Sequence, residues 1–268
     1  MRNKIVAILL VAVASLSAQR AMAWAAFGHG AIAYVAEQHL TDEAKSEVRR
    51  YLNHTLPFYA SWMDHWRAIE PYAHTNMWHG IKADESGKLR WDISGERANG
   101  QAMIQVKRIV EEMKDYRNMP DSLVRQNVIY LIHSVADMHC PVHVQFPKTT
   151  YPHYRYTLKR NGKKYLMHSF WDAAPNFTRS SWTYEQYAKE VDVLTPKQAK
   201  RILKGSYDVW GKDILKQTHR AYKITPAEKD VAKMTAEERT AALELEDEMA
   251  MKAAYRLAYI LNNIFGTK

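Results

Sequence analysis

The stretch Val128–Val144 reads V-I-Y-L-I-H-S-V-A-D-M-H-C-P-V-H-V, a long apolar run that also carries histidines and an aspartate. Its apolar residues recur at helical spacing, which predicts a buried helix that ends at Pro141. His133 and Asp137 are four residues apart, so they share one face of this helix. Such polar side chains need a partner on a core-facing helix, because burying an unpaired charge is costly. A divalent metal is one such partner, since His and Asp are both zinc ligands, and His143 lies where the chain can turn back to the same centre.

Length and composition indicate a soluble globular protein of one domain, or two at most. The chain has 268 residues, of which 47% are hydrophobic and 25% are charged, as is typical of globular domains. Gly and Pro are few, which argues against a sandwich of many short strands. The formal net charge of +9 and the pI near 9.4 suit a polyanionic or phosphate-bearing ligand.

Residues Met1–Ala23 are typical of a secretory signal peptide. A basic start is followed by the apolar run Ile5–Leu16 and the small-residue cleavage site Ala21-Met22-Ala23. The apolar run is shorter than the ~20 residues that a helix needs to cross a bilayer. Cleavage between Ala23 and Trp24 would remove three basic residues and no acidic residue, which lowers the formal charge from +9 to +6. We therefore expect a periplasmic or secreted protein, with no stable membrane anchor and no obligate protein partner.

Cys140 is the sole cysteine of the sequence, so an exported chain of this kind has no internal disulfide. It follows His133 by seven residues, which places it near the same helix face. We interpret Cys140 as a small buried hydrophobic residue. The alternative role of a soft metal ligand stays open.

The rest of the chain predicts further helices and one small β-hairpin. The hairpin is expected over 153–167, where Tyr residues alternate with other residues and Asn161-Gly162 supplies the turn. A capping box at Thr235–Glu238 starts the last long helix. No repeat or linker divides the chain, so we predict a single all-α domain, 24–268, with one hairpin. Helices are expected over 28–40, 42–52, 59–69, 97–117, 168–172, 195–204, 206–222 and 235–265.

Histidine and aspartate residues recur in short local patterns on apolar or aromatic segments. A single His or Asp of this kind fits a hydrogen-bond network as well as a metal site. Their joint occurrence favours a metal site, and their number exceeds the four ligands of one zinc and suits a cluster. The candidates are five histidines (His29, His79, His133, His143 and His168) and three aspartates (Asp64, Asp137 and Asp172).

These patterns resemble the S1/P1 nuclease family of zinc-dependent single-strand nucleases. The resemblance covers residues 24–172 and is weak in the C-terminal third. The matching motifs are Trp24 with Gly28-His29, Ser61-Trp62-Met63-Asp64 with Arg67, Trp78-His79, the set His133, Asp137, His139, Pro141 and His143, and His168 with Trp171-Asp172.

The resemblance implies the fold of the phospholipase C/P1 nuclease type and a site with three Zn²⁺ ions per chain. Two zincs would share a hydroxide that attacks a phosphodiester, and the third would take charge on the leaving 3′-oxygen. The implied ligands are Asp64, His79 and His133 for one zinc, His29 with the α-amine and carbonyl of Trp24 for a second, Asp137 as their bridge, and His143, His168 and Asp172 for the third.

The resemblance also implies that Asp64 and Arg67 are catalytic. Arg67 would donate to the developing phosphate charge, although it could instead simply pair with Asp64 three residues earlier. The implied substrate is single-stranded DNA or RNA, or nucleotides, cleaved by an endonuclease or a 3′-nucleotidase.

The sequence departs from the family pattern around the base-binding region. The family commonly has an aromatic residue directly after Trp-His and an acid shortly afterwards, and Gly80 and Lys82 stand at these places. We expect Lys82, Tyr154 and Tyr156 to contact substrate. A hydrophobic face of the hairpin is an alternative use of the tyrosines. Base discrimination is expected to be weak.

Two other functions remain open on the sequence alone. The zinc-dependent phospholipases C resemble the nucleases in fold and in their N-terminal Trp, but they place the first His later and use Glu where Asp172 stands. A non-enzymatic metal- or polyanion-binding protein is the second alternative. A complete set of three adjacent metal sites argues against it.

Overall fold

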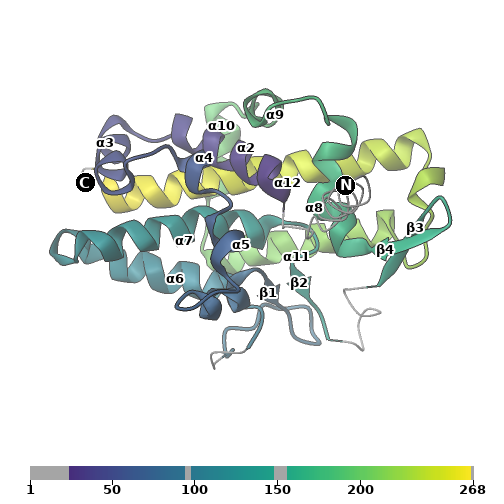
Figure 1. Ribbon diagram of the computed structural model, residues 1–268, viewed down its shortest axis with the longest axis horizontal. Coiled ribbons are helices and arrows are strands. Elements are labelled where there is room, and N and C mark those ends of the chain that lie inside the picture. The colour runs from purple at the N-terminus through teal and green to yellow at the C-terminus, as the bar shows by residue number, and fades with distance from the viewer. Residues whose placement is uncertain (1–23, 94–97, 148–155, 267–268) are drawn as a thin grey trace, which may run out of the picture.

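The computed structural model describes residues 24–93, 98–147 and 156–266. The predicted signal peptide and Tyr154 lie outside the described residues. The described chain is mainly helical with short strand pairs, as predicted. Figure 1 shows the long helices running side by side along the longest axis, with the hairpin at one end.

Helix α7 (Asp121–His139) is the central element, and it contains the predicted buried helix. Every residue from Asn127 to His139 is buried, which is the pattern of a helix surrounded by other elements. The helix ends at Cys140, directly before Pro141, which agrees with the end predicted from the proline. Helices α6 (Ala102–Glu112) and α12 (Ala236–Phe265) pack against α7.

Helix α12 runs through most of the length of the molecule (Figure 1, yellow). Its predicted capping box is present: the Thr235 hydroxyl accepts from the Glu238 N–H, and the Glu238 carboxylate accepts from the Thr235 N–H. Its buried face packs on α2 (Ala25–Gln38), α3 (Asp42–Leu52) and α11 (Tyr207–Ile224).

The other helices complete the layers around α7 and α12. Helix α9 starts with a capping box at Thr183–Gln186 and was not predicted from the sequence. The predicted short helix at 168–172 is the start of a longer one. These elements are α4 (Leu56–Tyr59), α5 (Trp62–Trp66), α8 (Met167–Thr178), α9 (Tyr184–Val191), α10 (Pro196–Leu203), and the 3₁₀ turns η1 (Ala73–Trp78), η2 (Met113–Asn118) and η3 (Val231–Lys233).

The prediction of one helix over 59–69 was wrong, because the helix is interrupted at Ala60–Ser61, between α4 and α5. The carbonyl of Ala60 accepts a hydrogen bond from Nδ1 of His133 at 2.8 Å. That carbonyl orients a side chain of α7 instead of continuing a helical ladder. The break therefore serves the site described below.

Two short strand pairs are present. The predicted hairpin pairs β3 (Thr157–Arg160) with β4 (Lys163–Leu166). Its Asn161-Gly162 turn has positive φ angles of 51° and 77°, as a type I′ turn requires. A parallel pair, β1 (Ile81–Lys82) with β2 (Val144–Gln145), was not predicted.

The β1–β2 pair joins the segments that follow His79 and His143. The Ile81 N–H donates to the His143 carbonyl at 2.8 Å. A Cβ at Gly80 would lie 2.6 Å from the same carbonyl oxygen. Glycine is therefore required at this crossing, and an aromatic side chain cannot stand there without moving the backbone.

None of the described helices is both long enough and apolar enough to cross a membrane.

Candidate metal centre

Asp137 is the central residue of the site. It projects from α7 one turn after His133, and both side chains are fully buried. Three histidines from separate parts of the chain reach its two oxygens. His79 Nδ1 lies 2.7 Å from Oδ2, His133 Nε2 lies 3.2 Å from Oδ2, and His29 Nε2 lies 3.2 Å from Oδ1.

Asp64 of α5 lies near the same three histidines. Its Oδ1 lies 3.7 Å from His79 Nδ1 and 3.8 Å from His133 Nε2, and its Oδ2 lies 3.9 Å from His29 Nε2. These separations are too long for hydrogen bonds. The Asp64 side chain is nevertheless fully buried, and neither oxygen accepts a hydrogen bond.

Neighbouring groups fix the orientation of the His133 ring. Its Nδ1–H donates to the Ala60 carbonyl, which directs Nε2 toward the two carboxylates. The ring also stacks on His29 with centroids 4.2 Å apart. A hydrogen bond to the far nitrogen is the arrangement that sets the tautomer of metal-binding histidines.

A second group of side chains lies next to the first. His143 Nε2 is 3.3 Å from Asp172 Oδ1, and His168 Nδ1 is 2.9 Å from Asp172 Oδ2. The two imidazoles stack with centroids 4.8 Å apart. His143 Nδ1 also lies 3.8 Å from Asp137 Oδ1, so the two groups form one continuous cluster.

Cys140 is fully buried beside the second group, and its thiol donates to Asp172 Oδ1 at 3.5 Å. Burial, with the nearby charges of Asp172 and Glu246, raises the pKa of the thiol well above its ordinary value. The thiol is therefore protonated at neutral pH, in line with its interpretation as a small buried residue.

The donor atoms of the cluster fit divalent metal ions. Buried polar atoms normally have hydrogen-bond partners, and here a concentration of them has none: His29 Nδ1 and Nε2, Asp64 Oδ1 and Oδ2, His79 Nε2, Asp137 Oδ1, His143 Nδ1 and Nε2, and Asp172 Oδ2. Leaving so many buried polar atoms unpaired is costly. Three sets bring candidate ligand atoms within 4.8 Å of one another: His29, His133 and Asp137; Asp64, His79 and His133; Cys140, His143 and Asp172.

Burial and the carboxylates act in opposite directions on the pKa values of the histidines. Burial acts to lower the pKa of His133, but the charges of Asp137 and Asp64 outweigh it and raise that pKa to about 9. Burial lowers the pKa of His79 to about 4. Burial also acts against ionisation of Asp137, and the surrounding histidines still hold its pKa well below the ordinary value. The cluster thus attracts positive charge, which a metal ion would supply.

Trp24 is fully buried at the beginning of α2. Its indole Nε1–H donates to the carbonyl of Ala136, the residue before Asp137, at 2.9 Å. Its own carbonyl accepts from the Gly28 N–H at 2.9 Å, next to His29. The ring therefore anchors the start of the described chain beside the cluster.

His139 belongs to the motif but faces away from the cluster. Its Nδ1–H donates to the Val135 carbonyl at 2.7 Å, and its Nε2 accepts from Arg256 Nη1 at 2.8 Å. Burial and the neighbouring guanidinium lower the pKa of His139 to about 3. His139 is a neutral structural residue that ties α7 to α12.

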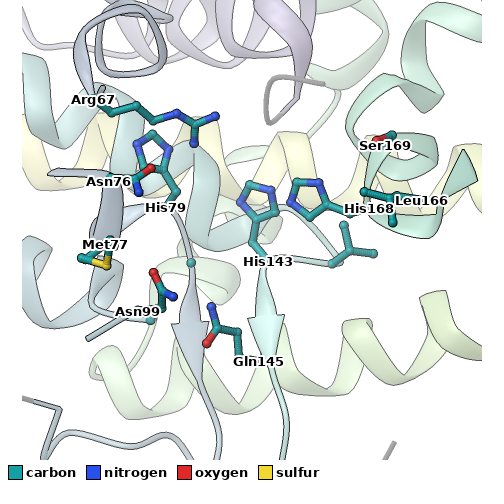
Figure 2. A pocket seen from close by; sticks show the side chains of 13 residues that line it. Arg67, Asn76, Met77, His79, Asn99, His143, Gln145, Leu166, His168 and Ser169 are labelled. Atoms are coloured by element: carbon teal, nitrogen blue, oxygen red, sulfur yellow. The ribbon is translucent and has the colours of Figure 1, made fainter. Parts of the chain in front are cut away.

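The cluster opens into a cleft of about 370 Å³. Figure 2 shows Arg67 and His79 on one side of this cleft and His143 and His168 on the other. Arg67 Nη2 lies 3.4 Å from Asp64 Oδ1, and 26% of the Arg67 side chain is exposed. The guanidinium thus stands between the buried cluster and solvent.

Lys82 and Tyr156, which were predicted to contact substrate, are not among the described residues that line this cleft. Lys82 lines a neighbouring hollow with Trp91. The Tyr156 hydroxyl donates to the Thr225 carbonyl, and its ring packs near Tyr222. Sequence reasoning missed Asn76, Asn99 and Gln145, which line the cleft. Isolated amide residues follow no periodic pattern, so only the fold reveals them.

Known proteins match this chain in sequence. Residues 24–266 match the sequence model of the S1/P1 nuclease family. The chain belongs to the S1/P1 nuclease family. It is 27% identical to nuclease P1 from Penicillium citrinum over 128 residues, which are 45% of this chain and 47% of that protein. Nuclease PA3 from Penicillium sp matches to the same extent. The chain thus spans about half the length of the curated relatives it matches.

Proposed function

We propose that this member of the S1/P1 nuclease family is a zinc-dependent phosphodiesterase that hydrolyses single-stranded DNA or RNA, as an endonuclease, a 3′-nucleotidase or both. The observation that carries the proposal is the cluster of buried, unpaired His and Asp atoms at the base of a cleft that also holds an arginine. The names of the curated relatives, nuclease P1 and nuclease PA3, support the same reaction class.

Three zinc ions per chain would occupy the cluster. Asp64, His79 and His133 would hold the first, and the α-amine and carbonyl of Trp24 with His29 the second. Asp137 would bridge these two, and His143, His168 and Asp172 would hold the third. When bound, zinc acts as a Lewis acid toward a phosphate oxygen and lowers the pKa of a water molecule toward neutrality.

The side chains of the chain itself position the phosphate and its charge. Arg67 has more N–H donors than its contact with Asp64 uses. The remaining donors are available to a phosphate in the cleft, whose negative charge grows during the reaction. Asp64 holds the guanidinium in place while contributing to the cluster, so these two residues act together as the catalytic pair.

The basic charge of the chain and the geometry of the cleft favour single strands. A flexible backbone can bring its phosphate to a recessed site, whereas a rigid duplex holds its bases stacked inward. The formal charge, which would be +6 after removal of residues 1–23, attracts a polyanion.

We also propose that the protein acts outside the cytoplasm, in the periplasm or after secretion. Residues 1–23 have the pattern of a signal peptide, and the family match begins at residue 24. Residues 24–268 would form the catalytic domain and start with the Trp24 α-amine.

Parallel hydrolysis assays test the proposal. The protein beginning at Trp24 is incubated with single-stranded DNA, single-stranded RNA, duplex DNA and phosphatidylcholine, with and without a chelator. Release of nucleotides from single strands, abolished by the chelator, is the expected result. Turnover of phosphatidylcholine without nucleotide release would establish the phospholipase alternative. A fully metal-loaded protein that is inert on every substrate would establish a binding protein.

A further inference from the structure

Three carboxamide side chains line the cleft beside the cluster. Asn76 belongs to η1, Asn99 to the segment before α6, and Gln145 to β2. Figure 2 shows all three next to His79 and His143. They therefore lie where the remainder of a nucleotide would extend when its phosphate is at the cluster.

The backbone around these residues is held by hydrogen bonds between the segments that carry them. The Gln145 carbonyl accepts from the Ala83 N–H at 2.9 Å, within the β1–β2 pair. The segment that carries Asn99 is tied to its neighbours by two further bonds, from Gln101 N–H to the Met77 carbonyl at 3.1 Å and from Ala102 N–H to the Gly80 carbonyl at 2.8 Å.

A close approach of the backbone fixes the position of Asn99. Gly100 has a φ of 94°, and a Cβ there would lie 2.8 Å from the Lys82 Cβ. Only glycine adopts this conformation readily and leaves the necessary space. The cleft edge that carries Asn99 is therefore packed directly against β1.

The three side-chain amides are free to bind a ligand. Asn76 and Asn99 are exposed and Gln145 is half-buried, and none forms a side-chain hydrogen bond with another residue in the described part of the chain. No acidic residue is among the described residues that line this cleft. A carboxamide offers a donor and an acceptor side by side, which is the pattern that pairs with the edge of a nucleobase.

An aromatic residue at position 80, which is common in the family, would not fit in this chain. A side chain at Gly80 would meet the backbone of His143, so an aromatic ring cannot stack on a base from that position. The amides project from other segments and need no space there. Rotation of an amide exchanges its donor and acceptor, so the same side chain can fit different bases.

Building on the proposed function, we infer that Asn76, Asn99 and Gln145 form the base-binding subsite of this chain and hold a nucleobase by its polar edge. Such a subsite binds every base and selects weakly among them. It replaces contacts that would come from an aromatic residue and an acid at positions 80 and 82.

The test compares a substrate that has bases with one that has none. The variants are N76A, N99A, Q145A and the triple variant, and the control is Q38A, an exposed carboxamide of α2 outside the cleft. For each protein, kcat/KM is measured on four single-stranded homopolymers and on bis(p-nitrophenyl) phosphate. The readout is the ratio of the two values, because a defect in metal binding or folding lowers both.

We expect the ratio to fall about fivefold for each single variant, which corresponds to one lost hydrogen bond, and by a similar factor for all four homopolymers. In the triple variant, the inhibition constant of nucleoside 5′-monophosphates should rise relative to that of inorganic phosphate. Q38A should match the wild type in both measurements.

An unchanged ratio in the triple variant would overturn the inference, as would a fall on one homopolymer alone. An equal loss on both substrates would also overturn it, since the amides would then serve the cluster or the fold. If the wild type cleaves bis(p-nitrophenyl) phosphate but no nucleic acid, the proposed function fails, and the base-binding subsite fails with it. Failure of the subsite alone leaves nucleic-acid hydrolysis by the wild type intact.

Discussion

At the scale of single residues, Asp137 has the most partners in the cluster. Four histidines lie within 4.0 Å of its oxygens, at distances between 2.7 and 3.8 Å. Among the described residues, two histidines lie within this distance of Asp172, namely His143 and His168. The two carboxylates are alike in chemistry and burial, so this difference in partners separates a bridging role from a terminal one.

We predict that Asp137→Ala loses more than one metal ion per chain, whereas Asp172→Ala loses only one. A bridging carboxylate serves two ions at once, and a terminal one serves a single ion. Elemental analysis of both purified variants measures the loss, and circular dichroism shows that each is folded. Equal metal loss in the two folded variants would contradict the assignment of Asp137 as the bridge.

Arg67→Ala should keep its metals and lower kcat by about two to three orders of magnitude, the usual effect of removing a donor to developing negative charge. Arg108→Ala is the matched control, because Arg108 pairs with Glu112 four residues later on the exposed face of α6. The measurements are kcat on a single-stranded oligonucleotide and zinc content. Turnover equal to that of the control would leave Arg67 as a simple partner of Asp64.

At the scale of elements, local signals predicted the long helices and the hairpin. Pro141 marked the end of α7, the Thr235 capping box marked the start of α12, and Asn161-Gly162 marked the hairpin turn. Each signal lies within a few neighbouring residues. The break at Ala60–Ser61 and the β1–β2 pair depend on partners far along the chain, which no local pattern contains.

The same distinction applies to the site. The metal-ligand candidates could be predicted because chemically unusual residues recur at fixed spacing in apolar segments, and the fold brings His29, Asp64, His79, His133 and Asp137 together. The carboxamides of the cleft could not be predicted, because they belong to three segments that meet only after folding. Arg256 was missed for the same reason, since it lies 117 residues from its partner His139.

The contact of Arg256 with His139 joins α12 to the end of α7 that carries Asp137. Arg256→Met should lower the free energy of unfolding by about 2 kcal/mol, because it leaves the buried Nε2 of His139 without a donor, while Asp213 keeps its bond from Lys252. Arg220→Met is the control, since Arg220 is 41% exposed in its pair with Glu248 and should cost less than about 1 kcal/mol. Denaturant unfolding of the metal-free proteins gives both values, and equal losses would contradict a special role for Arg256.

In the whole molecule, the start of the described chain lies beside the candidate metal cluster. Trp24 is buried against α7 at the residue before Asp137, although the two residues are far apart in sequence. On the proposal that the Trp24 α-amine is a metal ligand, removal of residues 1–23 would be needed to complete the site. An amide nitrogen within a chain has no lone pair available for a metal, whereas a free α-amine has one.

We predict that Met or Gly-Ser placed before Trp24 gives a folded protein with fewer zinc ions and sharply reduced nuclease activity. The control carries the same addition after Lys268, at the other end of the chain. Zinc content and hydrolysis rate are measured for both forms and for the protein that begins at Trp24. Full zinc occupancy and an unchanged rate in the N-terminally extended form would remove Trp24 from the metal site and leave it as a core residue.

We propose that the buried His and Asp side chains form one cluster for three metal ions. The number of ions is measured by elemental analysis of the protein that begins at Trp24, purified without added chelator and dialysed against metal-free buffer. We predict about three zinc ions per chain, as the number of ligands requires. Zinc content at or below about one ion per chain, in a folded protein that cleaves single-stranded nucleic acid in the presence of chelator, would contradict it.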